Sequence, residues 1–183
     1  NKYNVPVRVL SRFNNGKGTL ISLKDESMEN ALVSGIAFQK DQIKFTLHGV
    51  GDTPGTAFKI LGPVSDAEVE VDVIVQNVSV DGKTDFTFTV ASEDKDTVKE
   101  VLDKLKEDVS YTELIIDSNI AKVSIVGVGM RSQAGIASKA FKALSENGVN
   151  IQIICTSEIK ITMVIEKELV DKAVTVLHKE FEL

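Results

Sequence analysis

The sequence has little of what several classes of protein depend on. It contains one cysteine, Cys155, among 183 residues, so it cannot form an internal disulfide framework. No apolar run approaches the roughly 20 residues that a membrane-spanning helix needs. Tryptophan is absent, aromatic residues make up 5%, and the formal net charge is −6, whereas nucleic-acid and anionic-membrane binders rely on basic surfaces. We therefore expect a cytoplasmic protein that binds neither nucleic acid nor membrane.

Signals of catalysis and of metal binding are equally sparse. His48 and His178 lie far apart, and neither belongs to a cluster of cysteines or carboxylates at the spacing of metal ligands. The glycines at 49–51 lack the third glycine and the parallel context of a dinucleotide fingerprint. Cys155 alternates with apolar residues of a predicted strand, which predicts a buried thiol. We expect no metal site and no catalytic residue in this chain.

What the sequence does contain is an internal repeat. A glycine-rich stretch at 49–55 is followed by a helical pattern and by an apolar strand at 69–77. The same order returns with a glycine-rich stretch at 127–135, a helical pattern and a strand at 149–157. The second loop is two residues longer, and the register holds otherwise.

Both copies follow the same order of predicted elements. Apolar and polar residues alternate over 42–48, which is typical of a half-buried strand. The helix that follows is expected to have its N-cap at Asp52 or Thr53, and Pro63 inside it is expected to end or kink it early. The predicted strands cover 42–48, 69–77, 84–90, 121–126, 151–155, 160–165 and a short piece at 181–183, and the predicted helices begin near 54, 93, 136 and 168.

This order predicts an α+β protein made of two ferredoxin-like βαββαβ modules. Each module has an antiparallel sheet with its helices on one face. The two sheets can join edge to edge, or their exposed faces can pair between chains.

Five separated motifs resemble one family of regulatory modules. They are GDTPG at 51–55, VQNVS at 75–79, DFTFT at 85–89, SIVGVGM at 124–130 and TSEIKI at 156–161. In this order they resemble ACT domains, the amino-acid-binding units of many metabolic enzymes, and specifically the tandem ACT region of aspartate kinases. Cys155 stands where that family commonly has serine. Residues 3–13 and 18–21 resemble the end of the aspartate kinase catalytic domain, so the resemblance covers essentially the whole chain.

The resemblance implies a division of the chain. Residues 1–27 would be a remnant of the kinase domain, 28–110 the first ACT domain and 111–183 the second, whose last strand returns to the first. Met28 sits where some relatives begin a separate regulatory subunit. Because the chain begins with Asn1 rather than methionine, we expect it to be a piece of a longer protein, and the resemblance leaves open whether it is a natural β subunit or a truncated chain.

The same resemblance implies the allosteric region of an aspartate kinase. That enzyme transfers the γ-phosphoryl group of ATP to the side-chain carboxylate of L-aspartate, the first step of lysine, threonine and methionine biosynthesis. The implied effector is L-threonine, L-lysine or both, acting by feedback inhibition. The implied partners are a second copy of the chain, through its ACT domains, and the catalytic domain or α subunit, where alone ATP would bind.

The glycine-rich start of the first helix predicts a site for a small amino acid. Free N–H groups at a helix start bind a carboxylate, and glycine lets the ligand approach the backbone. Asp52 can pair with the α-ammonium group, and side chains of the next strand can reach the rest of the ligand. Plainer interpretations are that Asp52 only caps the helix and that Asp72 faces solvent. The candidate effector residues are Asp52, Thr53, Pro54, Gly55, Thr56, Ala57, Asp72, Gln76 and Asn77.

The corresponding loop of the second copy has different chemistry. It lacks the aspartate and carries Met130, Arg131 and Ser132, so we expect it to serve dimer contacts or a weaker site. By resemblance, the first module of one chain faces the second module of its partner. The residues expected to border the site across that interface are Asn150, Ile151, Thr156 and Ser157.

Two other functions compete with amino-acid sensing. A structural dimerisation module with a degenerate ligand site would bind no amino acid at roughly millimolar concentration. A ferredoxin-like RNA or metal binder is disfavoured by the few aromatic residues, the negative charge and the lack of a Cys-x-x-Cys motif.

Overall fold

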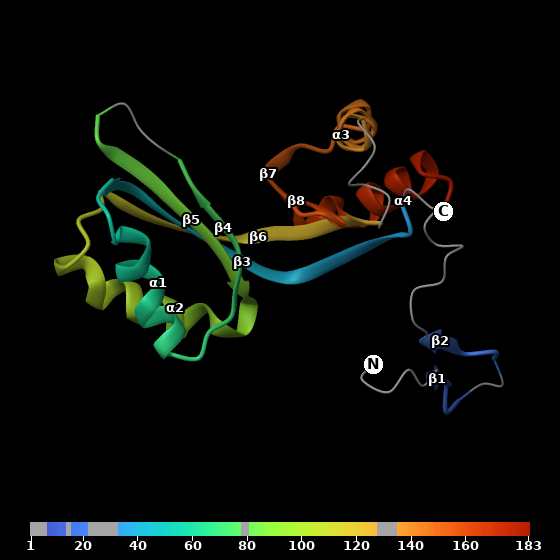
Figure 1. The fold of residues 1–183 in the computed structure, drawn as a ribbon, viewed down its shortest axis with the longest axis horizontal. Helices are drawn as coiled ribbons and strands as arrows, with labels where there is room; N and C mark the ends of the chain where they lie inside the picture. Colours follow the sequence, from blue (N-terminus) through green and yellow to red (C-terminus); the bar gives the residue numbers. More distant parts are fainter. Residues whose placement is uncertain (1–6, 14–15, 22–32, 78–80, 128–134) are drawn as a thin grey trace.

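The computed structural model describes residues 7–13, 16–21, 33–77, 81–127 and 135–183. These residues form two sheets. β1 (Val7–Val9) and β2 (Thr19–Ile21) make a two-stranded sheet, and the other strands make a six-stranded antiparallel sheet in the order β4-β5-β3-β6-β8-β7 (Figure 1). None of the described helices is both long and apolar enough to cross a membrane.

The six-stranded sheet divides into two units that repeat one order of elements. The first unit consists of the second half of β3 (Gly35–Gly51), α1 (Thr56–Asp66), β4 (Val71–Gln76), β5 (Lys83–Ala91), the short helix η2 (Ser92–Asp94), α2 (Lys95–Lys104) and η3 (Leu105–Glu107). The second unit consists of the second half of β6 (Glu113–Val126), α3 (Ile136–Glu146), β7 (Ile151–Thr156), β8 (Lys160–Glu166), η5 (Lys167–Leu169) and α4 (Val170–Glu180). The predicted α+β class and the ferredoxin-like plan are confirmed.

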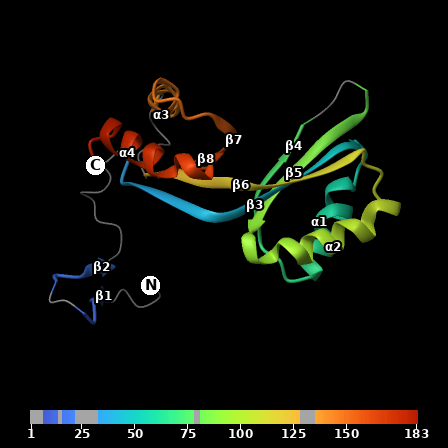
Figure 2. The same cartoon turned by 180° about the vertical axis from the view of Figure 1, so that it is seen from behind.

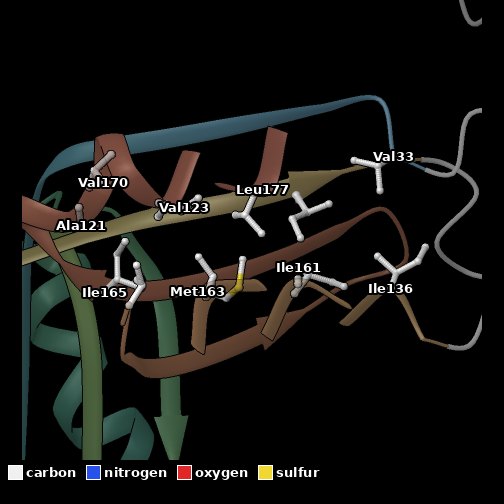
Figure 3. Close-up of a cluster of buried hydrophobic side chains, with 14 residues drawn as sticks. Val33, Ala121, Val123, Ile136, Ile161, Met163, Ile165, Val170 and Leu177 are labelled. Atoms are coloured by element: carbon white, nitrogen blue, oxygen red, sulfur yellow. The ribbon is translucent and has the colours of Figure 1, made fainter. Parts of the chain in front are cut away.

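Each unit buries its own apolar core between its helices and one face of the sheet. Side chains alternate along a strand, so Ile43 and Phe45 of β3 face α1 and α2, while Ile36 of the same strand packs against the core of the second unit. The helix pairs α1–α2 and α3–α4 therefore cover opposite faces of the sheet (Figure 1, Figure 2). In the second core, Met163 of β8 packs with Leu177 of α4 (Figure 3).

The strand register confirms the predicted repeat. Phe45 lies opposite Phe88 of β5, with ring centroids 5.5 Å apart, and Val123 of β6 lies opposite Met163. The buried triplets that correspond in the two units are Ile43, Phe45 and Leu47 in β3 and Ala121, Val123 and Ile125 in β6. Repeat-equivalent residues can therefore be compared directly between the units.

β3 and β6 are long enough to serve both units. Residues 44–48 of β3 pair with 113–117 of β6 in the first unit, and residues 35–39 of β3 pair with 122–126 of β6 in the second. The prediction of a strand at 181–183 is wrong, because residues 35–39 already occupy that place beside β6. The predicted domain boundary at 27/28 lies outside the described residues. The predicted boundary at 110/111 stays a prediction; β3, before it, and β6, after it, pair with each other in both units.

The predicted start and end of the first helix are wrong. Gly55, at φ 94°, is the N-cap residue of α1 instead of Asp52 or Thr53. The helix also runs through Pro63 to Asp66. A proline this close to the end of a helix removes one backbone hydrogen bond, and Ile60 and Val64, both fully buried, hold the last turn on the core.

The prediction that Cys155 is buried is also wrong. Cys155 is exposed. β7 is an edge strand, and its register is irregular between Ile151 and Ile153. The end of the strand therefore presents Cys155 to solvent rather than to the core.

Candidate effector-binding site

The loop between β3 and α1 is held by hydrogen bonds of its own. The Asp52 N–H donates to the Gly82 carbonyl (2.9 Å), and the Thr56 N–H donates to the Thr53 carbonyl (3.1 Å). The Thr56 hydroxyl donates to the Gly51 carbonyl (2.9 Å) and lies 3.1 Å from the Thr53 hydroxyl. Thr56 is 5% exposed, so its side chain supports the loop, while the exposed Asp52 and Thr53 remain available to a ligand.

The first turn of α1 offers backbone donors to an anion. The Lys59 N–H donates to the Gly55 carbonyl (2.9 Å), and the N–H groups of Ala57 and Phe58 precede the first possible intrahelical bond. The N-cap makes no side-chain hydrogen bond, and the first turn holds no acidic residue. A methyl group on Gly55 would have no atom within 4 Å. This end of α1 can therefore receive a carboxylate, which the helix dipole favours.

Gln76 and Asn77 lie at the same end of the sheet as this loop. β4 and β3 are both antiparallel to β5, so they run in the same direction and their C-terminal ends lie at the same end of the sheet. Both side chains are exposed. The structure thus brings Asp52, Thr53, Pro54, Gly55, Ala57, Gln76 and Asn77 to one end of the first unit.

Asp72 does not join this group. It lies at the start of β4, four residues before Gln76 and about 13 Å away along an extended strand. Its carboxylate pairs with the ammonium group of Lys122 on β6. Asp72 therefore has a partner in the second unit and lies away from the loop.

A set of contacts that the sequence analysis missed fixes the end of β3. The Gly49 N–H donates to Asp85 Oδ1 (3.0 Å), and His48 Nδ1 lies 2.9 Å from Asp85 Oδ2. The backbone N–H of Gly49 and then the His48 side chain hold the pKa of Asp85 below its ordinary value. Aspartate is unfavourable within a strand. The presence of Asp85 in the predicted strand at 84–90 was therefore the sign in the sequence that its carboxylate has a specific partner.

Gly49 is required by both conformation and space. Its φ is +67°, and an added Cβ would lie 2.2 Å from the hydroxyl of Thr112. Thr112 donates both its N–H (2.8 Å) and its hydroxyl (2.9 Å) to the His48 carbonyl. The loop that carries Asp52 is therefore anchored to the chain that enters β6.

The second unit repeats the helix start. Gly135, at φ 102°, is the N-cap residue of α3, and the Lys139 N–H donates to its carbonyl (2.9 Å). Met130, Arg131 and Ser132 lie outside the described residues.

The four remaining candidates of the second unit fall into two groups. Asn150 and Ile151 line a pocket of about 510 Å³ beside α3, together with Phe141 and Ile154. Thr156 and Ser157 lie at the other end of β7, about 20 Å along the strand. Among the described residues, no group of three or more His, Cys, Asp and Glu side chains could hold a metal ion.

Comparison with known proteins identifies the family of this chain. ACT domain families match residues 47–109 and 123–181. The fold matches a crystal structure of aspartokinase α and β subunits with a TM-score of 0.78 and 46% identity, covering 82% of this chain and 99% of that one. The ligand-free regulatory subunit of aspartate kinase from Thermus thermophilus matches with a TM-score of 0.78 and 33% identity over 82% and 99% of the two chains.

The chain belongs to the aspartokinase regulatory family. The predicted pair of ACT domains and the regulatory, non-catalytic assignment are confirmed by these matches. An aspartokinase of Pseudomonas aeruginosa is 57% identical over 184 residues, which cover all of this chain and 45% of that protein. The chain thus spans less than half the length of this curated aspartokinase.

Proposed function

We propose that the chain is the amino-acid sensor of an aspartokinase and that L-threonine or L-lysine is its effector. The observation that carries the proposal is that the start of α1 and the end of β4 lie at the same end of the first unit. This end of the sheet carries backbone donors of α1, the Asp52 carboxylate and two exposed amide side chains. These groups complement a carboxylate, an ammonium group and a polar side chain.

In this arrangement each part of the ligand has its own contact. The α-carboxylate accepts hydrogen bonds from the N–H groups of Ala57 and Phe58. The α-ammonium group pairs with Asp52, a charge-assisted contact. The ligand side chain reaches Gln76 and Asn77. These two residues would therefore determine whether the site prefers threonine or lysine.

The proposed partner is a second copy of the chain, which would cover the grooves beside α1 and α3 and the outer strands next to them. The groove beside α1, of about 430 Å³, is lined by Phe58, which is 78% exposed, and Leu61. Leu61 corresponds in the repeat to Phe141 in the groove beside α3. The neighbouring edge strands β4 and β7 expose Ile74 and Ile154. Exposed edges with apolar side chains are typical of surfaces that another chain covers.

The two grooves fit a symmetric dimer in which the first unit of one copy faces the second unit of the other. The dimer would then place residues of the second unit at the border of each effector site. The bordering residues would be Asn150, Ile151, Thr156 and Ser157, and the loop with Met130, Arg131 and Ser132 would serve dimer contacts or a weaker site.

The proposed outcome of effector binding is inhibition of the catalytic unit. An aspartokinase catalytic domain or α subunit would phosphorylate the side-chain carboxylate of L-aspartate with ATP, and the effector-bound ACT dimer would favour its inactive arrangement. Such coupling is reciprocal and typically worth about 1–3 kcal/mol. The purified chain alone is expected to transfer no phosphate from ATP to aspartate.

Calorimetric titration of the purified chain with L-threonine and with L-lysine tests the proposal. We expect saturable binding of one of them, no binding of its D-enantiomer, and loss of binding in Asp52→Ala. Asp103→Ala, which removes an exposed carboxylate on α2, is the matched control and should bind as the wild type does. A chain that dimerises but binds neither amino acid would instead be the structural dimerisation module.

A further inference from the structure

Two lysines, the buried Lys122 and the partly buried Lys44, reach from one unit to the outer strand of the other. Lys122 of β6, in the second unit, contacts the Asp72 carboxylate on β4 of the first. Lys44 of β3, in the first unit, places its Nζ 2.5 Å from Gln152 Oε1 on β7 of the second. The Lys122 side chain is 3% exposed and the Lys44 side chain 16%. Lys122 is thus buried at the junction between the units, and Lys44 is partly buried there.

The repeat relates these two contacts to each other. In the register of the buried triplets, Lys44 corresponds to Lys122, since each stands between the first two members of its triplet. Asp72 and Gln152 each hold the second position of the strand that follows the first helix of their unit. The same cross-unit contact therefore occurs twice, once with a carboxylate and once with an amide as the acceptor.

The acceptors lie on the strands that have the least other support. β4 and β7 are the two outer strands, and each pairs with one neighbour only, β5 and β8. β4 leads directly to Gln76 and Asn77, and β7 is flanked by the candidate residues of the second unit. A lysine that holds the start of such a strand also restrains the residues that follow it in the strand.

The geometry points to Lys122 and Lys44 as positioning residues of the effector site. Each lysine fixes the outer strand of the opposite unit, so that a shift of β4 on effector binding is passed to β6 and the second unit. This inference rests on the proposed function for its ligand, but the positioning itself requires no ligand.

The two contacts differ in strength for a physical reason. Lys44 has a second acceptor, Asp117 Oδ2, at 3.2 Å, so its charge stays paired if Gln152 is lost. Asp72 supplies the counter-charge of Lys122, and a buried lysine without its counter-charge is costly. The effect of breaking the contact should therefore be larger on β4 than on β7.

Hydrogen exchange of the full 183-residue chain tests the positioning. We expect Lys122→Met to speed exchange of residues 71–76 about tenfold and to leave residues 151–156 unchanged. Lys44→Met should do the reverse, to a smaller extent. Lys40→Met is the matched control, because Lys40 of β3 pairs with Asp171 of α4 (2.8 Å) and touches neither outer strand.

Two further variants separate positioning from general loss of structure. Lys122→Arg keeps the charge and should keep the protection of β4. Asp72→Asn changes a half-exposed side chain, should leave the fold intact, and should loosen β4 as Lys122→Met does. Faster exchange confined to β6, or spread evenly over the second unit, would overturn the inference.

Titration with the effector completes the test. Lys122→Met should lower the affinity about threefold to tenfold, and Lys122→Arg should restore it. If the wild-type chain binds neither threonine nor lysine, the proposed function fails, while the exchange experiment still decides the positioning. Unchanged hydrogen exchange of β4 in both Lys122→Met and Asp72→Asn would contradict the inference that Lys122 positions β4, whichever ligand the chain binds.

Discussion

The two units of this chain have the same backbone plan but different chemistry at the same places. Both begin their first helix at a glycine in the left-handed region, Gly55 and Gly135. Both join their central strands by a pair of hydroxyl groups, Thr46 with Thr87 (3.1 Å) and Ser124 with Thr162 (2.9 Å). Features that the repeat preserves in both units therefore serve the fold.

The two units differ at the loop before the first helix and at the contact between each lysine and the opposite outer strand. Asp52 has no acidic counterpart in the second loop, and Asp72 corresponds to Gln152 in the second unit. Asp85 binds the Gly49 N–H and the His48 side chain, whereas Val126, which corresponds to His48 in the second unit, lies opposite Lys160 of β8. These differences support the proposed ligand site in the first unit, and four measurements can contradict it.

The largest expected effect separates Asp72 from Gln152. Asp72→Ala leaves the ammonium group of Lys122 without its counter-charge, and we expect a loss of about 2–3 kcal/mol of unfolding free energy, less than for a fully buried pair because Asp72 is half exposed. Gln152→Ala removes a neutral acceptor while Asp117 remains beside Lys44, so we expect a loss below about 1 kcal/mol. Urea denaturation measures both, and equal losses would contradict the asymmetry.

The next effect concerns the ligand. Asp52→Asn keeps the size of the side chain but removes its charge, and we expect effector affinity to fall at least about tenfold, since hydrogen bonds to charged groups contribute about 1.5–3 kcal/mol. The measurement is calorimetric titration, with Asp103→Asn on α2 as the control for a lost surface charge. Undiminished affinity would remove Asp52 from the site.

A smaller effect tests the equivalence of the helix starts. Gly55→Ala and Gly135→Ala each force a side chain into a left-handed conformation, at φ 94° and 102°, with open space around it. Each should cost about 1 kcal/mol of unfolding free energy, and the two values should agree. A markedly larger loss at Gly55 would mean that its loop is held by contacts that the second unit lacks.

The smallest effect is the pH dependence due to Asp85. Its folded pKa lies below its ordinary value of 3.8, so the unfolded state takes up its proton first as pH falls. The stabilisation is therefore complete above pH 3.8 and is lost as pH falls through the lower, folded pKa. Because Asp85 is half exposed, we expect a difference of a few tenths of a kcal/mol.

Acid unfolding followed by circular dichroism compares the wild type with Asp85→Asn. The variant should show a flatter stability curve on the acid side, and the two curves should converge at the lowest pH. A constant offset at every pH would mean that Asp85 acts through packing alone.

Local pattern was enough to predict the repeat and most helices and strands of the two units. The alternation over 42–48 and the corresponding triplet in β6 could be read from spacing, because side chains of a strand alternate between its faces. The glycine-rich loops predicted where the helices begin, although the N-cap lies at Gly55, where the left-handed conformation favours glycine, rather than at Asp52 or Thr53. Errors of this size are local, since neighbouring residues compete for the same cap.

Partners that are distant in the sequence could not be predicted in this way. The pairing of Asp72 with Lys122 spans 50 positions, and the spacing of either residue gives no sign of the other. The same limit explains the missed set of His48, Asp85 and Thr112, and the exposed Cys155 on an outer strand.

The amino-acid sequence by itself determined the α+β class, the duplicated module and the position of the glycine-rich loop, because each of these follows from periodicity and turn chemistry within short stretches. Tertiary structure alone decided that β3 and β6 run through both units and that the two helix pairs lie on opposite faces of the sheet. It also decided that a lysine of each unit contacts the outer strand of the other. Strand pairing and side-chain reach join residues that are far apart in the chain, and burial then fixes which of them meet.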